Sequence, residues 1–176
     1  MTTTPEGTLT WEPAARHTEL VAAPVAGALG NLPSARVATI DPDLADTAAF
    51  CEAYDSALDH SANCVVVAGK RAGQTRYAAV MVLATMRADI NNVVRRHLDV
   101  RKISFAAMDE AVRLTGMEYG GITPVGLPDD WPVLVDQAVV DAGTVVIGSG
   151  IRGSKLLVDA KELAALPTAE VLQLAG

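Results

Sequence analysis

The alternation of apolar and polar positions predicts several strands in the first half of the chain. Residues Ala35 to Ile40 form a short β-rich run. Asn63 to Ala68 and Tyr77 to Ala84 are longer runs of the same kind, and Gly69 to Gln74 separates them. Two β-rich runs joined by a short segment that contains glycine are typical of a hairpin. We therefore expect an antiparallel hairpin with a basic tip.

Polar residues placed just before apolar positions at helical spacing predict helix starts. The expected starts are, in chain order, Asp46 or Thr47, Asp89, Ser104 and Asp159. The helix from Asp89 continues through Leu98, and the helix from Ser104 ends at Gly116, since glycine is a frequent C-cap. Glu162 completes the spacing of an acidic capping box at the start of the C-terminal helix.

Three more β-like runs follow: Pro132 to Val135, Thr144 to Ile147 and Lys155 to Val158. Hairpins mixed with irregularly placed helices lack the regular βαβα order of a doubly wound sheet. We expect an α+β fold in which a strongly curved, barrel-like mixed β-sheet is surrounded by helices. Residues 1–16 have no sustained periodicity and are expected to form a flexible tail before a single domain at 17–176.

Composition supports one cytoplasmic domain. The chain has 176 residues, of which 50% are hydrophobic and 4% aromatic, so Val, Ala and Leu must build most of the core. The longest apolar run, Ala78 to Ala84, is too short to span a bilayer, and the polar N-terminus does not resemble a signal peptide. Cys51 and Cys64 are too few for a disulfide framework, which points to a reducing compartment.

The net charge of −7 argues against broad binding to nucleic acids such as DNA, but the charge is unevenly distributed. The window from Lys70 to Lys102 contains eight of the 14 Lys and Arg residues, with only Asp89 and Asp99 as acidic residues. A local anion-binding face is therefore one interpretation. An ordinary solvated surface is the other.

The most informative stretch is Thr115 to Gly126, which contains four glycines and a proline in twelve positions. Loops of this kind can direct several main-chain N–H groups toward a carbonyl, a carboxylate or a phosphate. This interpretation predicts a ligand-binding loop. The alternative is a helix C-cap at Gly116 followed by a tight turn at Gly120 and Gly121.

Gly148, Gly150 and Gly153 match the spacing of a dinucleotide-binding fingerprint. That motif requires its last glycine to open a helix that faces a pyrophosphate. Here Ser154 to Val158 has an extended pattern, so we reject this interpretation. A glycine-rich hairpin turn is expected instead, with Arg152 as a candidate ligand contact.

Several blocks together resemble the YbaK/EbsC family, the free-standing relatives of the editing insertion domain of prolyl-tRNA synthetases. The similar blocks are Ala62 to Val66, Thr115-Gly116 with Gly120 to Gly126, Pro132 to Asp136, and Gly148 to Gly153. The resemblance extends from about His17 to Leu166, and the Gly-Gly-x-x-Pro-x-Gly block is its most specific part.

The resemblance implies hydrolysis of the ester between a wrong amino acid and the terminal adenosine of a tRNA. It implies a water positioned by main-chain groups of the glycine-rich loop and by the substrate's own ribose hydroxyl. The implied catalytic residues are Gly120, Gly121, Thr123 and Asn63. The implied substrate-binding residues are Ile122, Pro124, Gly126, Asp136, Gly150 and Arg152. The expected partners are the aminoacyl-tRNA acceptor end and an aminoacyl-tRNA synthetase, with no metal, other cofactor, membrane or DNA.

The residues themselves leave alternatives open. Many family members carry a lysine where this chain has Asn63, which still forms hydrogen bonds but provides no cation. A non-catalytic module that binds aminoacyl-tRNA or a small carboxylate is therefore a second hypothesis, and a hydrolase for another small ester is a third. For Asn63, Thr123, Asp136 and Arg152, structural roles in strands and turns are equally open.

Overall fold

The computed structural model describes residues 3–175, so Met1 and Thr2 of the predicted tail and Gly176 of the predicted domain lie outside it. The strands in this range are β1 (Glu12–Pro13), β2 (Arg36–Thr39), β3 (Ala62–Arg71), β4 (Gln74–Leu83), β5 (Lys102–Phe105), β6 (Val133–Asp136), β7 (Thr144–Gly148), β8 (Ser154–Asp159) and β9 (Ala169–Leu172). The helices are α1 (Ala23–Ala28), α2 (Thr47–Tyr54), α3 (Arg95–His97), α4 (Met108–Thr115), α5 (Gln137–Ala142) and α6 (Ala160–Ala164).

The strands form two sheets. One is antiparallel with the order β1-β2-β8-β7, and the other has the order β5-β3-β4-β6-β9. The second sheet is mixed, because β3 pairs antiparallel with β4 and β5 whereas β4-β6 and β6-β9 are parallel. The predicted mixed α+β fold is thus confirmed. No closed or strongly curled sheet is found among residues 3–175, so the barrel-like shape stays a prediction.

The main core lies between the two sheets, and apolar residues from both supply it. Met81 and Val135 come from the mixed sheet, while Val37, Ile147 and Leu156 come from the antiparallel sheet, and all are buried. A parallel bridge between Ser61 and Val146 joins the start of β3 to β7. Because of this bridge, one end of β3 lies against the antiparallel sheet.

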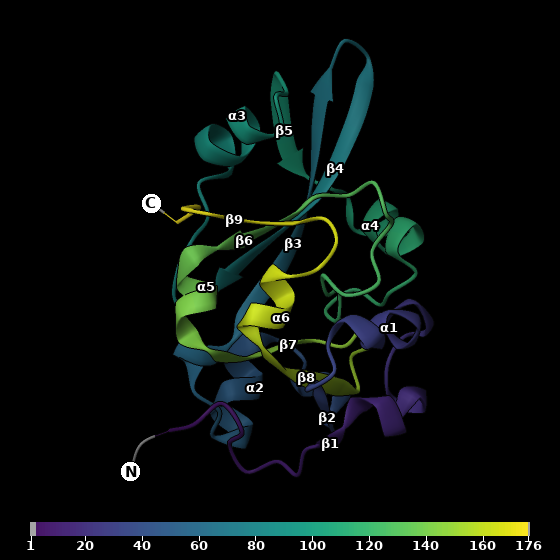
Figure 1. The fold of residues 1–176 in the computed structure, drawn as a ribbon, viewed down its shortest axis with the longest axis vertical. Helices are drawn as coiled ribbons and strands as arrows, with labels where there is room; N and C mark the ends of the chain where they lie inside the picture. The colour runs from purple at the N-terminus through teal and green to yellow at the C-terminus, as the bar shows by residue number, and fades with distance from the viewer. Residues whose placement is uncertain (1–2, 176) are drawn as a thin grey trace.

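The β3–β4 hairpin extends away from this core. The two strands pair from Ala62–Leu83 to Arg71–Gln74, which confirms the predicted hairpin and leaves a two-residue turn. Figure 1 shows the hairpin tip at one end of the long axis, with β5 and α3 beside it. One strand of this sheet therefore runs from the core to the far end of the molecule.

Most of the predicted helix starts agree with the structure. Asp46 caps α2, and Asp89 caps a π-helical turn, Ile90–Val94, that continues into α3. Asp159 caps α6 through a 2.9 Å bond from the Lys161 amide. Glu162 does not complete the predicted capping box, because its carboxylate accepts a 2.7 Å hydrogen bond from the Ser34 hydroxyl instead.

The prediction of a helix from Ser104 was wrong in its start. Ser104 lies in β5, where it pairs with Ala68 of β3, and α4 begins at Met108. Pairing with the sheet edge here outweighs the capping tendency of serine. Strand β9 was not predicted; it adds to β6 in parallel.

Part of the segment expected to be a tail contacts the domain. Glu12 and Pro13 pair with β2, and the Ala14 side chain is fully buried. The Ala57 amide donates a 2.9 Å hydrogen bond to the Thr4 carbonyl. These contacts connect residues from Thr4 onward to the rest of the fold.

Candidate functional site

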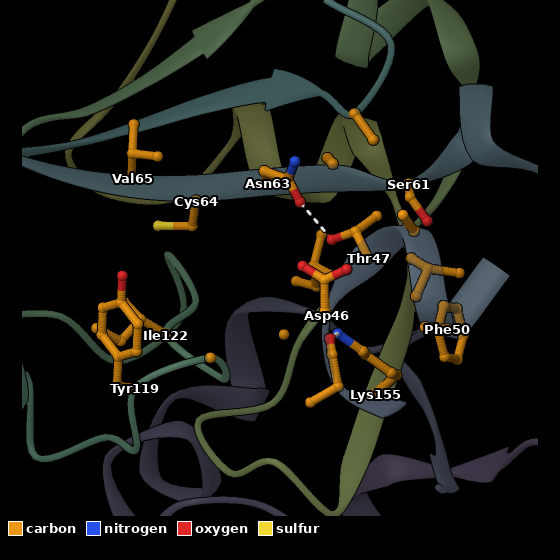
Figure 2. A pocket seen from close by; sticks show the side chains of 18 of the residues that line it. Asp46, Thr47, Phe50, Ser61, Asn63, Cys64, Val65, Tyr119, Ile122 and Lys155 are labelled. Atoms are coloured by element: carbon orange, nitrogen blue, oxygen red, sulfur yellow. Dashed lines mark hydrogen bonds between the residues drawn. The ribbon is translucent and has the colours of Figure 1, made fainter. Parts of the chain in front are cut away.

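A cavity of about 760 Å³ opens between the two sheets. Its walls include the start of α2, the first half of β3, the loop Tyr119–Ile122, the strands β7 and β8, and Phe105–Ala106 at the end of β5. In Figure 2 the side chains of Cys64, Tyr119 and Ile122 lie on one side of the cavity, and those of Asp46, Thr47 and Lys155 lie on the other. The cavity therefore has an apolar side and a polar side.

The first turn of α2 is fixed to β3 by side chains. Asp46 accepts a hydrogen bond from the Ala49 amide at 3.5 Å and so caps the helix. The hydroxyl of Thr47 donates a 2.7 Å hydrogen bond to Oδ1 of Asn63. Asn63 is thus held in the cavity wall by its oxygen.

Cys64 contributes its thiol to the apolar side of the cavity (Figure 2). Burial raises the pKa of the Cys64 thiol to about 12. Because the thiolate is the nucleophilic form, a thiol with this pKa is a poor nucleophile at neutral pH. Cys64 therefore acts as a small apolar surface.

Lys155 of β8 is the cationic residue of the polar side. Its side chain is only 7% exposed, Nζ donates a 2.8 Å hydrogen bond to the Ala45 carbonyl, and Nζ lies 5.3 Å from the centre of the Phe50 ring. Burial lowers the pKa of Lys155, while nearby Cys51 and Asp46 oppose that shift. No ion pair to Lys155 occurs within residues 3–175. An ammonium group buried without an ion pair is costly, so this lysine is a candidate for a ligand contact.

Two main-chain hydrogen bonds fix the glycine-rich loop against the β7–β8 turn, and a third closes the loop on itself. The Glu118 amide bonds to the Gly150 carbonyl, the Gly150 amide to the Gly121 carbonyl and the Gly121 amide to the Glu118 carbonyl, at 2.7–3.0 Å. A Cβ at Gly121 would lie 2.7 Å from the main chain of Ile151. Only glycine permits this close approach.

The amides of Gly120 and Ile122 differ from that of Gly121. Both residues line the cavity, and neither N–H is hydrogen-bonded to another residue of the described range. Gly120 has a φ of +91°. The Arg152 side chain lies against Gly120 and is held there by hydrogen bonds that it donates to the carbonyls of Tyr119 and Pro42. The loop therefore keeps two main-chain donors available at the cavity.

The structure brings three of the ten predicted site residues to the cavity: Asn63, Gly120 and Ile122. Three others lie at the contact between the loop and the β7–β8 turn: Gly121, Gly150 and Arg152. Thr123, Pro124, Gly126 and Asp136 do not line the cavity. The predicted loop thus borders the cavity at Gly120 and Ile122, whereas Thr123 does not line it.

The residues away from the cavity have structural contacts of their own. Asp136 is 1% exposed, and its Oδ1 accepts hydrogen bonds from the amides of Leu174 and Ala175, which tie the C-terminal segment to β6. Gly126, with a φ of +83°, packs against the main chain of Pro24. Thr123 is fully buried, and its hydroxyl has no hydrogen-bond partner among the described residues.

Sequence reasoning did not identify Asp46, Thr47, Tyr119 or Lys155 as site residues. Asp46 and Thr47 were recognised only as a helix start. Lys155 was placed correctly in a strand, but nothing in the local pattern indicates that its side chain would be buried beside residue 45. A lysine directly before the apolar run Leu156–Val158 is the available signal.

Two further observations apply to the described part of the chain. No group of three or more His, Cys, Asp and Glu side chains gathers closely enough to hold a metal ion. No helix of residues 3–175 is long and apolar enough to cross a membrane.

Comparison with known proteins identifies the fold and the family. The model of the aminoacyl-tRNA editing domain matches residues 41–166. Proline–tRNA ligases of Lactobacillus johnsonii and Lactobacillus gasseri are each 37% identical to this chain over 73 residues, which is 40% of this chain and 13% of each ligase. The chain therefore corresponds to only a small part of these ligases.

Solved structures agree on the fold. A protein proposed to be a trans-editing enzyme for prolyl-tRNA synthetase superposes with a TM-score of 0.73 at 22% identity, covering 95% of this chain and 99% of that protein. A signal transduction protein of Marinobacter aquaeolei shares the fold more distantly, with a TM-score of 0.57 at 19% identity over 86% of this chain and 30% of that protein.

The family match, together with the shared fold, defines an editing-type domain. The chain belongs to the aminoacyl-tRNA editing domain family, the YbaK-type domain associated with prolyl-tRNA synthetases.

Proposed function

We propose that the chain is a trans-editing hydrolase that cleaves the ester between a wrongly attached amino acid and the terminal ribose of a tRNA. The observation that carries this proposal is the cavity with one apolar and one polar side, whose lining residues Gly120 and Ile122 have N–H groups without a partner among residues 3–175. An aminoacyl ester has matching parts, because it joins a side chain to a polar ester and an ammonium group. Membership of the editing family supports the same substrate class.

In this proposal the apolar side, with Cys64, Val66 and Ile122, receives the amino acid side chain. The carboxylate of Asp46 lies on the polar side and is suited to the α-ammonium group.

The chemical step needs a water and donors for the carbonyl oxygen. Water adds to the ester carbonyl carbon, and the bond from that carbon to the ribose oxygen breaks. A proton from the water passes to the departing ribose oxygen, which leaves as a hydroxyl. We infer that the neighbouring ribose hydroxyl and the main chain of Gly120 and Ile122 position the water. Nζ of Lys155 is suited to stabilise the negative charge that develops on the carbonyl oxygen.

The experiment is a deacylation screen. Purified protein is incubated with a panel of mischarged tRNAs that carry small amino acids, including tRNA for proline, and the released amino acid is measured. Correctly charged tRNAs are the controls and should remain charged. If every mischarged tRNA survives a high protein concentration, the hydrolase proposal is refuted, and saturable binding without turnover would instead identify a binding module. Turnover of free aminoacyl esters but not of tRNA would identify a hydrolase for small esters.

A further inference from the structure

Strand β3 connects the cavity to the basic hairpin tip. All of its residues from Ala62 to Val66 line the cavity, and of these Cys64 and Val66 belong to the apolar clusters that include Ile122 of the glycine-rich loop. Because side chains alternate along a strand, residues 64, 66, 68 and 70 share one face of the sheet. Lys70, an exposed residue, therefore lies on the same face as Cys64 and Val66.

A second lysine lies directly beside the first. Lys102 of β5 is the cross-strand partner of Lys70, and both side chains are exposed. Like charges placed directly opposite each other destabilise a sheet. Among residues 3–175 neither lysine forms an ion pair. The fold therefore holds two unneutralised cations together on the face that leads to the cavity.

The other cations of the tip differ from this pair. Arg71 and Arg76 belong to the opposite face, because Arg71 follows Lys70 and Arg76 pairs with Gly69. Arg71 forms an ion pair with Asp99, and Arg76 donates a 3.0 Å hydrogen bond to the Leu98 carbonyl. The side chains of these arginines have partners within the protein, whereas those of Lys70 and Lys102 have none among residues 3–175.

The spacing suits a polynucleotide. Val66 and Lys70 are four residues apart on β3, which is about 13 Å at ~3.3 Å per residue. Ala106, which follows β5 directly and lines the cavity, is four residues from Lys102, again about 13 Å at ~3.3 Å per residue. A nucleic acid strand in a duplex carries a phosphate every ~3.4 Å along its axis, so about three to four phosphates span this distance.

We propose that Lys70 and Lys102 bind the phosphates of an RNA strand whose 3′ end enters the cavity. This inference rests on the proposed function, since it supplies the docking surface for the tRNA. It also explains how a chain with a net charge of −7 would bind RNA, through a local basic face rather than its overall charge.

The test measures binding of uncharged tRNA for proline by fluorescence anisotropy at several salt concentrations. The double variant Lys70→Gln and Lys102→Gln is compared with Arg71→Gln and Arg76→Gln, which removes the same charge from the opposite face. We expect the lysine variant to bind on the order of tenfold more weakly at low salt. Its slope of log affinity against log salt should fall by about 1.4–1.8, as for two lost phosphate contacts. The arginine variant should keep the wild-type slope.

Three results would each overturn the inference: equal losses of tRNA affinity in both variants, no loss of affinity in the lysine variant, or no tRNA binding by the wild type at low salt. Thermal unfolding shows whether each variant folds. If the arginine double variant does not fold, the single changes Lys70→Gln and Arg71→Gln give the same comparison between faces. Binding is measured without hydrolysis, so face-specific binding by a protein that deacylates nothing would refute the proposed activity and leave this inference standing.

Discussion

The hydroxyl of Thr47 donates a 2.7 Å hydrogen bond to Oδ1 of Asn63, and this bond joins the start of α2 to β3 at the cavity wall. It links two segments that the sequence separates by 16 residues. The bond assigns the oxygen of Asn63 to the protein. Its amide nitrogen is then the group available for a ligand.

This arrangement separates two roles of Asn63. Thr47→Val removes the donor but keeps the side-chain shape, and we expect a loss of about 0.5–1.5 kcal/mol in the free energy of unfolding, the usual net contribution of one hydrogen bond. Asn63→Ala also removes the amide nitrogen, so it should lower kcat/KM for deacylation by at least about tenfold, or ~1.4 kcal/mol. Urea denaturation and deacylation rates measure the two effects. Equal activity losses in both variants would mean that Asn63 only holds the wall.

Lys155 is expected to act on the reacting carbonyl. Lys155→Met keeps most of the apolar stem and removes the ammonium group, and kcat should fall about a hundredfold with a smaller change in KM, as for other oxyanion donors. Lys161→Met is the matched control, because Lys161 is an exposed lysine on α6 and should leave kcat unchanged. A Lys155→Met variant with wild-type kcat would remove Lys155 from the mechanism.

The same lysine gives a pH dependence of stability. Burial lowers the pKa of Lys155 in the folded protein, so between that pKa and the unfolded value of 10.5 the unfolded state binds more protons. The wild type should therefore gain stability relative to Lys155→Met as pH rises through this window. Urea denaturation of both proteins from pH 7 to pH 10 measures the difference. A difference that stays constant would show that Lys155 remains charged throughout.

The sequence predicted the parts of this site that depend on local pattern. Asn63 and Cys64 were assigned to a strand, and the glycine-rich loop was recognised because its backbone requirements appear in its composition. Lys155 and Asp46 were missed because their meeting depends on tertiary packing: Lys155 reaches the Ala45 carbonyl across 110 residues of sequence. Thr123 was placed at the cavity because a shift of one residue within the loop decides which residues line the cavity. That shift also depends on tertiary packing.

Cys64 should be unreactive despite its place in the cavity. Its pKa of about 12, against an ordinary 9.0, lowers the thiolate fraction at pH 8 by about a thousandfold. Iodoacetamide labelling followed by mass spectrometry of the Cys64 peptide should be correspondingly slow in the native protein and become fast after denaturation. Cys64→Ala should retain deacylation. Fast native labelling together with an inactive alanine variant would instead identify a nucleophile.

Thr123 offers a test of the residue that the sequence placed at the centre of the site. Its buried hydroxyl has no partner among the described residues, so Thr123→Val should raise the free energy of unfolding by about 1 kcal/mol. Activity should stay within twofold, because the side chain does not line the cavity. If Thr123→Val is inactive while Thr123→Ser is active, the hydroxyl takes part in the reaction after all.

Gly121 should be the most sensitive position of the loop. A Cβ there would lie 2.7 Å from main-chain atoms of Ile151, which cannot move aside as a flexible side chain could. Gly121→Ala should therefore push the loop away from the β7–β8 turn and lower stability by about 1–3 kcal/mol, the usual range for overpacking. The displaced loop would also move the amides of Gly120 and Ile122, so deacylation should be lost even where the variant is fully folded.

Gly27→Ala provides the control for Gly121→Ala. Gly27 lies within α1, and a Cβ there would meet no atom within 4 Å, so alanine should leave activity unchanged and raise stability by about 0.5–1 kcal/mol. Thermal unfolding and deacylation assays on the two variants separate two effects. One is the close contact between Gly121 and the main chain of Ile151, and the other is a general effect of replacing glycine. A folded Gly121→Ala variant with wild-type turnover would mean that the position of this loop does not govern the reaction.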